Sequence, residues 1–218
     1  MHRVVITGAG AVSPLGMDVN TIFSSLSEGI SGITQLNFYN SERLSVKIGG
    51  QIHGYNPDDY FSKQEKSIYD KFTQFALIAS KEAILESGLE FNEDDCTKIG
   101  VILGTAGGGL QTQDENYRQV YENGKNRVHP FIVPKLMNNA AASHVSIKFN
   151  IQGPCFTIAS ACSSSNHAMG LALNLLRTGT IKVAITGGSE SMLCFGGIKA
   201  WEGLRVMSKE SCRPFCKT

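Results

Sequence analysis

The sequence predicts an α/β fold, in which a mostly parallel or mixed sheet is covered by helices on both faces. Continuous apolar runs of strand type lie at residues 4–7, 99–103 and 182–186, and such runs are typical of strands buried on both faces. Helical patterns separate these runs, and the clearest amphipathic pattern covers residues 70–87. Alternation of strands with helices favours crossover connections and therefore parallel strand pairs.

The first strand, over residues 4–7, is followed by a short helix over residues 18–29, where four apolar side chains recur at helical spacing. These side chains are Val19, Ile22, Phe23 and Leu26. Residues 31–66 show no period and contain Pro57 with several Asn, Asp and Gly residues. We therefore expect an irregular excursion over the surface.

The helix over residues 70–87 carries an apolar stripe and ends before Gly88, a plausible C-cap. A short buried strand is expected over residues 156–159, and a helix over residues 163–178, closed by Gly179. The stripe of the first of these helices consists of Phe72, Phe75, Ala76, Ala79 and Ala83.

The composition is that of one globular domain: 218 residues, 42% hydrophobic and 18% charged. Twenty basic and nineteen acidic residues give a net charge of +1, which provides no electrostatic footprint for nucleic acid or anionic membranes. No run of eighteen apolar residues and no signal-peptide pattern occurs, so we expect a soluble, cytoplasmic protein. The six cysteines show no spacing suited to zinc, so we expect neither a metal site nor disulfides.

Two glycine-rich runs resemble known motifs only superficially. Residues 8–13 mimic a dinucleotide fingerprint, but Ser13 occupies the position where Gly or Ala is needed for close helix packing. Residues 187–191 fall short of the nucleophile elbow of serine hydrolases, because Ser191 replaces the last glycine. A nicotinamide enzyme and a serine hydrolase are both disfavoured.

The most informative run, residues 153–170, places Cys162 between a strand and a helix of small residues. At a helix N-terminus, unpaired N–H groups and the positive end of the dipole favour a thiolate over a thiol. The small residues around Cys162 leave room for a substrate, so Cys162 is the candidate nucleophile. The alternative is that Cys162 is a small buried hydrophobic residue, as most free cysteines are.

Residues 153–170 resemble the active-site signature of the β-ketoacyl-(acyl carrier protein) synthases, and closest are the elongating, synthase II-like enzymes. Further stretches resemble other parts of this family in family order. They are residues 1–16, 99–110, 130–154, 182–192 and 207–215.

The resemblance implies that residues 1–218 form the N-terminal domain of such a synthase, the first half of a thiolase-like fold. Each half of that fold has a five-stranded mixed sheet with helices on both faces, and the last strand of this half would be missing. The second half, which carries two catalytic histidines and a lysine, would be absent. Cys216 stands where the family usually has an aspartate.

The implied reaction is acyl transfer to Cys162 followed by decarboxylative Claisen condensation with a malonyl group on its carrier. The backbone N–H of Cys162 would be one oxyanion donor. The implied partners are an acyl carrier protein, with its phosphopantetheine-bound acyl and malonyl groups, and a second copy of the chain paired through residues 155–158. No cofactor is implied. His167 is expected to be structural, since five residues along a helix point it away from Cys162.

Other assignments from the resemblance leave alternatives open. Gly107 would line and widen the acyl pocket, or simply make a turn. Lys63, Lys66 and Lys71 would dock the acidic carrier, or form only a solvated face. The whole chain would belong to a condensing enzyme, or be a non-catalytic truncated remnant or partner subunit of one.

Overall fold

The computed structural model describes residues 2–91 and 96–215, which divide into two compact units. The larger unit comprises Met1–Gly10 and Pro57–Ser191, and the smaller comprises Ala11–Asn56 and Met192–Thr218. In the described part of the chain, no helix is both long enough and apolar enough to cross a membrane. The expectation for Cys216 lies outside the described residues.

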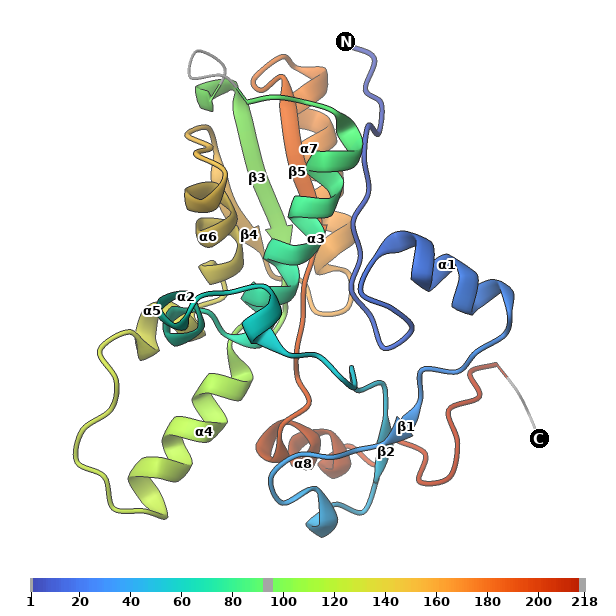
Figure 1. The fold of residues 1–218 in the computed structure, drawn as a ribbon, viewed down its shortest axis with the longest axis vertical. Helices are drawn as coiled ribbons and strands as arrows, with labels where there is room; N and C mark the ends of the chain where they lie inside the picture. Colours follow the sequence, from blue (N-terminus) through green and yellow to red (C-terminus); the bar gives the residue numbers. More distant parts are fainter. Residues whose placement is uncertain (1, 92–95, 216–218) are drawn as a thin grey trace. The chain divides into compact units, whose positions relative to one another are not determined.

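The larger unit contains a sheet of three parallel strands, in the order β4-β3-β5 (Figure 1). The strands are β3 (Ile99–Gly104), β4 (Cys155–Ile158) and β5 (Val183–Gly188). Central strand β3 is fully buried, as its continuous apolar run predicts. Because the strands are parallel, their carboxyl ends lie at one edge of the sheet.

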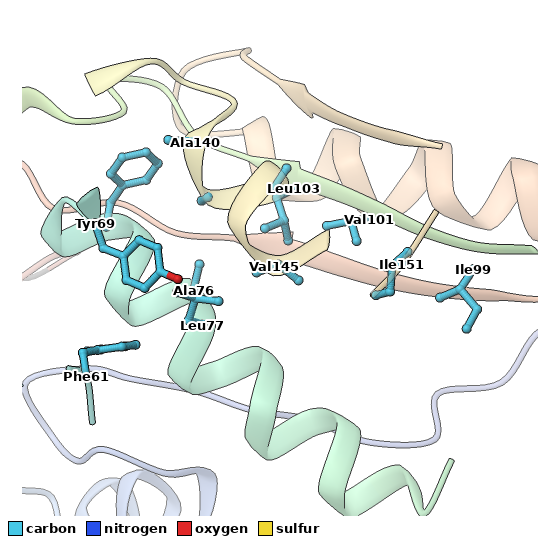
Figure 2. Packing of buried hydrophobic residues seen from close by; sticks show 13 residues of the cluster. Phe61, Tyr69, Ala76, Leu77, Ile99, Val101, Leu103, Ala140, Val145 and Ile151 are labelled. Atoms are coloured by element: carbon cyan, nitrogen blue, oxygen red, sulfur yellow. The ribbon is translucent and has the colours of Figure 1, made fainter. Parts of the chain in front are cut away.

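Helices cover both faces of this sheet, and side chains of β3 alternate between them. Ile99, Val101 and Leu103 belong to a core shared with α3 (Lys71–Ser87) and α6 (Ala140–Lys148), part of which is drawn in Figure 2. Ile102 packs on the other face, against α7 (Ser164–Arg177). The predicted α/β class is confirmed.

The ends of the two long helices match their sequence signals. The carboxylate of Asp70 accepts the N–H of Phe72 at 3.2 Å, and Gly88 ends α3 at a φ of +64°. Helix α7 begins after Ser163, and Gly179 follows it at a φ of +73°. The unit also contains α2 (Lys63–Ile68), α4 (Leu110–Tyr121) and α5 (Ile132–Leu136).

The predicted strand over residues 4–7 is wrong, because this stretch forms no strand ladder. Two glycines that follow this stretch instead bring the chain close to α3. A Cβ added at Gly8 would lie 2.1 Å from the carbonyl oxygen of Ala83, and one added at Gly10 would lie 1.8 Å from the carbonyl oxygen of Ala79. Residues 4–8 and β5 line a common groove of about 360 Å³. Among the described residues, the sheet of this unit therefore has three strands, whereas the resemblance implied a five-stranded sheet that lacks only its last strand.

The smaller unit holds α1 (Val19–Ser27), α8 (Phe195–Gly203) and an antiparallel pair, β1 (Thr34–Gln35) with β2 (Ile48–Gly49). Helix α1 confirms the predicted helix, but none of its residues is buried, so its apolar face is not a core face. The irregular excursion predicted over residues 31–66 contains these two short strands and the start of α2. The core of the unit is formed by Leu36, Leu44 and Ile198.

Candidate active site at the carboxyl edge of the sheet

Cys162 lies exposed in the turn that connects β4 to α7. The residue before it, Ala161, has a φ of +52°, in the left-handed region that non-glycine residues rarely adopt. The hydroxyl of Ser164 accepts the N–H of Ser160 at 2.9 Å and donates to the carbonyl of Ala161 at 2.7 Å. Ser164 is buried, so these two hydrogen bonds hold the turn that presents the thiol to solvent.

His167 is hydrogen-bonded within the same turn, through Nδ1, to the hydroxyl of Ser160 at 2.6 Å. This contact ties the first turn of α7 to Ser160, which lies two residues after the end of β4. The purely structural role expected of His167 stays a prediction.

Two glycines let the strand ends approach the start of α7 closely. A Cβ at Gly104, the last residue of β3, would lie 2.3 Å from the carbonyl carbon of Ser164. A Cβ at Gly188, the last residue of β5, would lie 2.8 Å from the Cβ of Ser165. The ends of β3 and β5 therefore pack directly against the residues that follow Cys162.

Gly107 lies in the turn between β3 and α4, and this turn is held by a side chain that our sequence analysis missed. One carboxylate oxygen of Glu190, Oε2, accepts three hydrogen bonds: from the hydroxyl of Thr105 at 3.0 Å, the N–H of Ala106 at 2.9 Å and the N–H of Gly107 at 3.0 Å. The available signal was an acidic residue two positions after the pair of glycines that ends a strand-type run. Whether Gly107 lines an acyl pocket stays a prediction.

Asp70 is a second missed residue, and it fixes the helix that follows the Gly107 turn. Its buried carboxylate accepts the N–H of Thr112 at 2.9 Å and the Thr112 hydroxyl at 2.5 Å. The same side chain caps α3, so it joins the starts of α3 and α4. The sequence shows only that Asp70 stands at the start of this helix.

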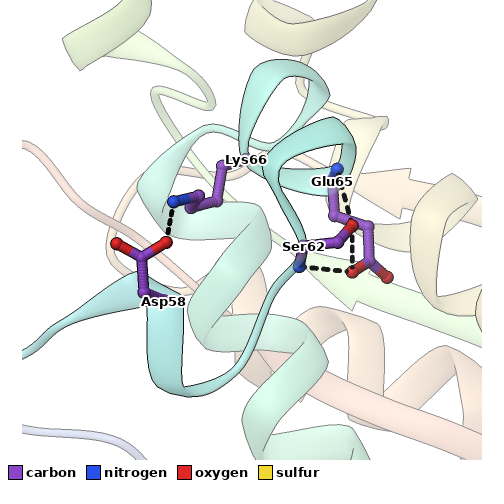
Figure 3. Close-up of polar contacts among 4 residues, drawn as sticks. All are labelled: Asp58, Ser62, Glu65 and Lys66. Atoms are coloured by element: carbon purple, nitrogen blue, oxygen red, sulfur yellow. Dashed lines mark hydrogen bonds and ion pairs between the residues drawn. The ribbon is translucent and has the colours of Figure 1, made fainter.

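The three lysines considered for carrier docking differ in their surroundings. Lys63 and Lys71 are the first residues of α2 and α3, whereas Lys66 forms an ion pair with Asp58 (Figure 3). The same helix begins with a capping box, in which Ser62 accepts the N–H of Glu65 at 3.3 Å. An ion pair with Asp58 offsets the charge of Lys66, so the cluster is less basic than the sequence alone indicates.

The two cysteines near the sheet differ in environment. Cys155, in β4, is half-buried, and burial raises the pKa of its thiol despite a hydrogen bond with Ser146. Cys162 is exposed, so it is the more accessible sulfur of the two. Among the described residues, no group of three His, Cys, Asp or Glu side chains is placed to hold a metal ion.

A family model, the N-terminal domain of β-ketoacyl synthases, matches residues 1–218. The chain belongs to this family. It is 34% identical to 3-oxoacyl-[acyl-carrier-protein] synthase 2 of Staphylococcus aureus (strain COL) over 218 residues, which are 98% of this chain and 53% of that protein. It is 38% identical to nodulation protein E of Rhizobium leguminosarum bv. trifolii over 214 residues, which are 98% of this chain and 53% of that protein.

Solved structures with the same fold are also ketosynthases. The ishigamide ketosynthase/chain length factor superposes with a TM-score of 0.88 at 20% identity, over 98% of this chain and 53% of that one. A β-ketoacyl synthase from Burkholderia phymatum STM815 superposes with a TM-score of 0.83 at 22% identity, over 99% and 54%. The chain has the thiolase-like fold of the N-terminal half, and it spans about half the length of the relatives it matches.

Proposed function

We propose that this chain is the N-terminal half of a 3-oxoacyl-(acyl carrier protein) synthase and that Cys162 accepts the acyl group. The observation that carries the proposal is the exposed thiol of Cys162, presented on a constrained turn immediately before α7. The family match and the synthase relatives support this reading. The substrate is an acyl thioester, delivered on the phosphopantetheine arm of an acyl carrier protein.

In the first step, the Cys162 thiolate attacks the acyl carbonyl carbon, a new C–S bond forms, and the thiol of the carrier arm leaves. The backbone N–H of Cys162 donates to the oxyanion that forms during this attack. In the second step, the malonyl group on its carrier loses CO₂, and its carbanion attacks the acyl-cysteine. A C–C bond forms, the C–S bond to Cys162 breaks, and the sulfur is regenerated. The two histidines that polarise the malonyl thioester would come from the second half.

Two structural features support completion of the site by further polypeptide. Strand β5 pairs with β3 along one edge, and its other edge faces the apolar groove shared with residues 4–8. This arrangement leaves a place for a further strand, such as the missing last strand that the resemblance implies. Among the described residues, strand β4 pairs along one edge only, which suits pairing of residues 155–158 across the two-fold axis of a cytoplasmic homodimer.

The proposal is tested by intact-mass spectrometry of the native protein, before and after incubation with a long-chain acyl carrier protein. We expect a single acyl adduct, which Cys162→Ser abolishes and Cys212→Ser retains, since Cys212 is also exposed but lies in the other unit. A native protein that takes up no acyl group would refute the proposal and favour the non-catalytic remnant or partner subunit. Sedimentation equilibrium of the same sample tests the dimer, which a monomer mass would contradict.

A further inference from the structure

The side chain of Glu190 reaches from the end of β5 to the turn after β3. All three of its hydrogen bonds to that turn converge on Oε2, and two of them come from the consecutive N–H groups of Ala106 and Gly107. The third comes from the hydroxyl of Thr105, which is buried. Three hydrogen bonds that meet on one oxygen make Glu190 a polar restraint on the turn.

The backbone at Gly108, next to these hydrogen bonds, has little room to change conformation. Gly108 has a φ of +59°, and its N–H donates to the hydroxyl of Thr105 at 3.3 Å. A Cβ at Gly108 would lie 2.5 Å from Oδ1 of Asn138. The hydroxyl of Thr105 therefore links Glu190 to Gly108, and the carboxylate fixes the course of the backbone through Gly107.

This turn is also tied to the strand that leads to the nucleophile. The N–H of Thr105 donates to the carbonyl of Ile158, the last residue of β4, at 3.1 Å. The N–H of Ser189 donates to the carbonyl of Gly104 at 3.1 Å. The turns after β3 and β5 are thus joined to each other, and the first of them is joined to β4, which precedes Cys162.

We propose that Glu190 is a positioning residue: it holds the backbone at Ala106 and Gly107 in place and thereby sets which acyl chain lengths Cys162 accepts. This inference rests on the proposed function, because it assigns the Gly107 turn to the wall of the acyl site. Without the carboxylate, the two N–H groups lose their acceptor and the wall is free to shift. A displacement of about 1 Å in a positioning element can change a rate by up to about 100-fold, and long chains contact more of the wall than short ones.

The test compares three variants of the complete protein in which residues 1–218 occur. Glu190→Leu removes the acceptor at similar side-chain size, Glu190→Gln keeps one oxygen that can replace Oε2, and Glu90→Leu controls for loss of an exposed glutamate elsewhere in the same unit. The first readout is hydrogen–deuterium exchange of peptides that cover Ala106 and Gly107. The second is the ratio of Cys162 acylation rates with dodecanoyl and acetyl thioesters of N-acetylcysteamine, followed by intact mass.

For Glu190→Leu, we expect exchange at Ala106 and Gly107 to be roughly tenfold faster. We expect its dodecanoyl-to-acetyl ratio to fall roughly tenfold. Glu190→Gln should restore both values to within about twofold of the wild type, because the hydrogen bonds rather than the charge fix the turn. The Glu90→Leu protein should behave as the wild type.

Unchanged exchange in Glu190→Leu would overturn the proposal. An equal loss of rate for both thioesters would also overturn it, because that outcome indicates general destabilisation without a change in specificity. Failure of Glu190→Gln to rescue either readout would assign the effect to something other than the hydrogen bonds and count against it too. If the wild type itself takes up neither acyl group, the proposed function fails, and the exchange data alone decide whether Glu190 holds the turn.

Discussion

Replacement of Gly104 by alanine should separate β3 from the start of α7. The added Cβ would lie 2.3 Å from the carbonyl carbon of Ser164, 2.4 Å from the N of Ser165 and 2.5 Å from the carbonyl oxygen of Ser164. Ordinary van der Waals contact begins at 3.4 Å, so the backbones must move apart by 3.4 − 2.3 = 1.1 Å. All three atoms belong to backbone, so a side-chain rotation cannot relieve the clash.

The cost can be estimated from comparable changes. Overpacking of a well-packed site costs about 1–3 kcal/mol of folding stability, and we take the upper value, about 3 kcal/mol, because the clash is with backbone atoms. Replacing glycine lowers the entropy of the unfolded chain and returns up to about 1 kcal/mol. We therefore expect Gly104→Ala to lower the free energy of unfolding by about 2 kcal/mol.

Gly170→Ala is the matched control. Gly170 lies inside α7, and nothing lies within 4 Å of a Cβ added there. Alanine is better than glycine in a helix interior by about 1 kcal/mol, so this variant should be stabilised. The two variants should therefore differ by about 3 kcal/mol, which corresponds to about 1.5 M in the urea midpoint at a slope of about 2 kcal/mol/M.

The assay is urea unfolding followed by far-ultraviolet circular dichroism, with the alkylation rate of Cys162 measured on the folded protein. We expect the alkylation rate to change in Gly104→Ala and to stay constant in Gly170→Ala, because only the first change displaces Ser164 and Ser165, next to the turn that holds Cys162. Wild-type stability in Gly104→Ala would refute the close approach of β3 to α7. A changed stability with an unchanged alkylation rate would refute the link between this approach and the position of Cys162.

Three further outcomes follow from the environments of single side chains. Under limiting iodoacetamide near neutral pH, peptide mapping should show Cys162 modified well before Cys155, whose thiol pKa is raised by burial; equal rates would contradict this. Burial lowers the pKa of His144 below its usual 6.5, so the unfolded state binds a proton at this side chain more readily, and the free energy of unfolding should fall as the pH drops below about 6.5. His144→Phe should reduce this dependence of the free energy of unfolding on pH in urea titrations, and an unchanged dependence would exclude His144 as its source. Hydrogen bonding to Lys148 lowers the pKa of Glu65 from 4.5 to about 2, so this stabilisation is present above pH 4.5 and lost between pH 4.5 and 2. Solvent reaches both partners, so the contribution is under about 1 kcal/mol; Lys148→Met should flatten that window of the acid-unfolding curve, and an unchanged window would contradict this assignment.

Local patterns were sufficient where one chain segment decides its own structure. The stripe of α3 and its Gly88 cap predict a helix whatever lies opposite, and the apolar run of β3 predicts a strand buried on both faces. The turn with Cys162 was placed correctly because both of its flanks, a strand and a helix of small residues, carry signals of their own.

Pairing and long-range polar contacts were not predictable in this way. Residues 4–7 have the composition of a strand, but a strand also requires a neighbour with matching hydrogen bonds, and sequence composition says nothing about that neighbour. Glu190 contacts Thr105, Ala106 and Gly107, which lie 83 to 85 positions earlier in the chain. Only the parallel order of β3 and β5 brings these residues to the same edge.

The small residues around Cys162 have a structural cause that the sequence interpretation did not contain. We read them as space for a substrate, but Gly104 and Gly188 show that the strand ends already occupy one side of this segment, against Ser164 and Ser165. A larger residue at position 164 would also lose the hydroxyl that holds Ala161 in its left-handed conformation. Close packing on the inner side therefore fixes the turn, and this allows the Cys162 thiol on the outer side to stay exposed in a constant position.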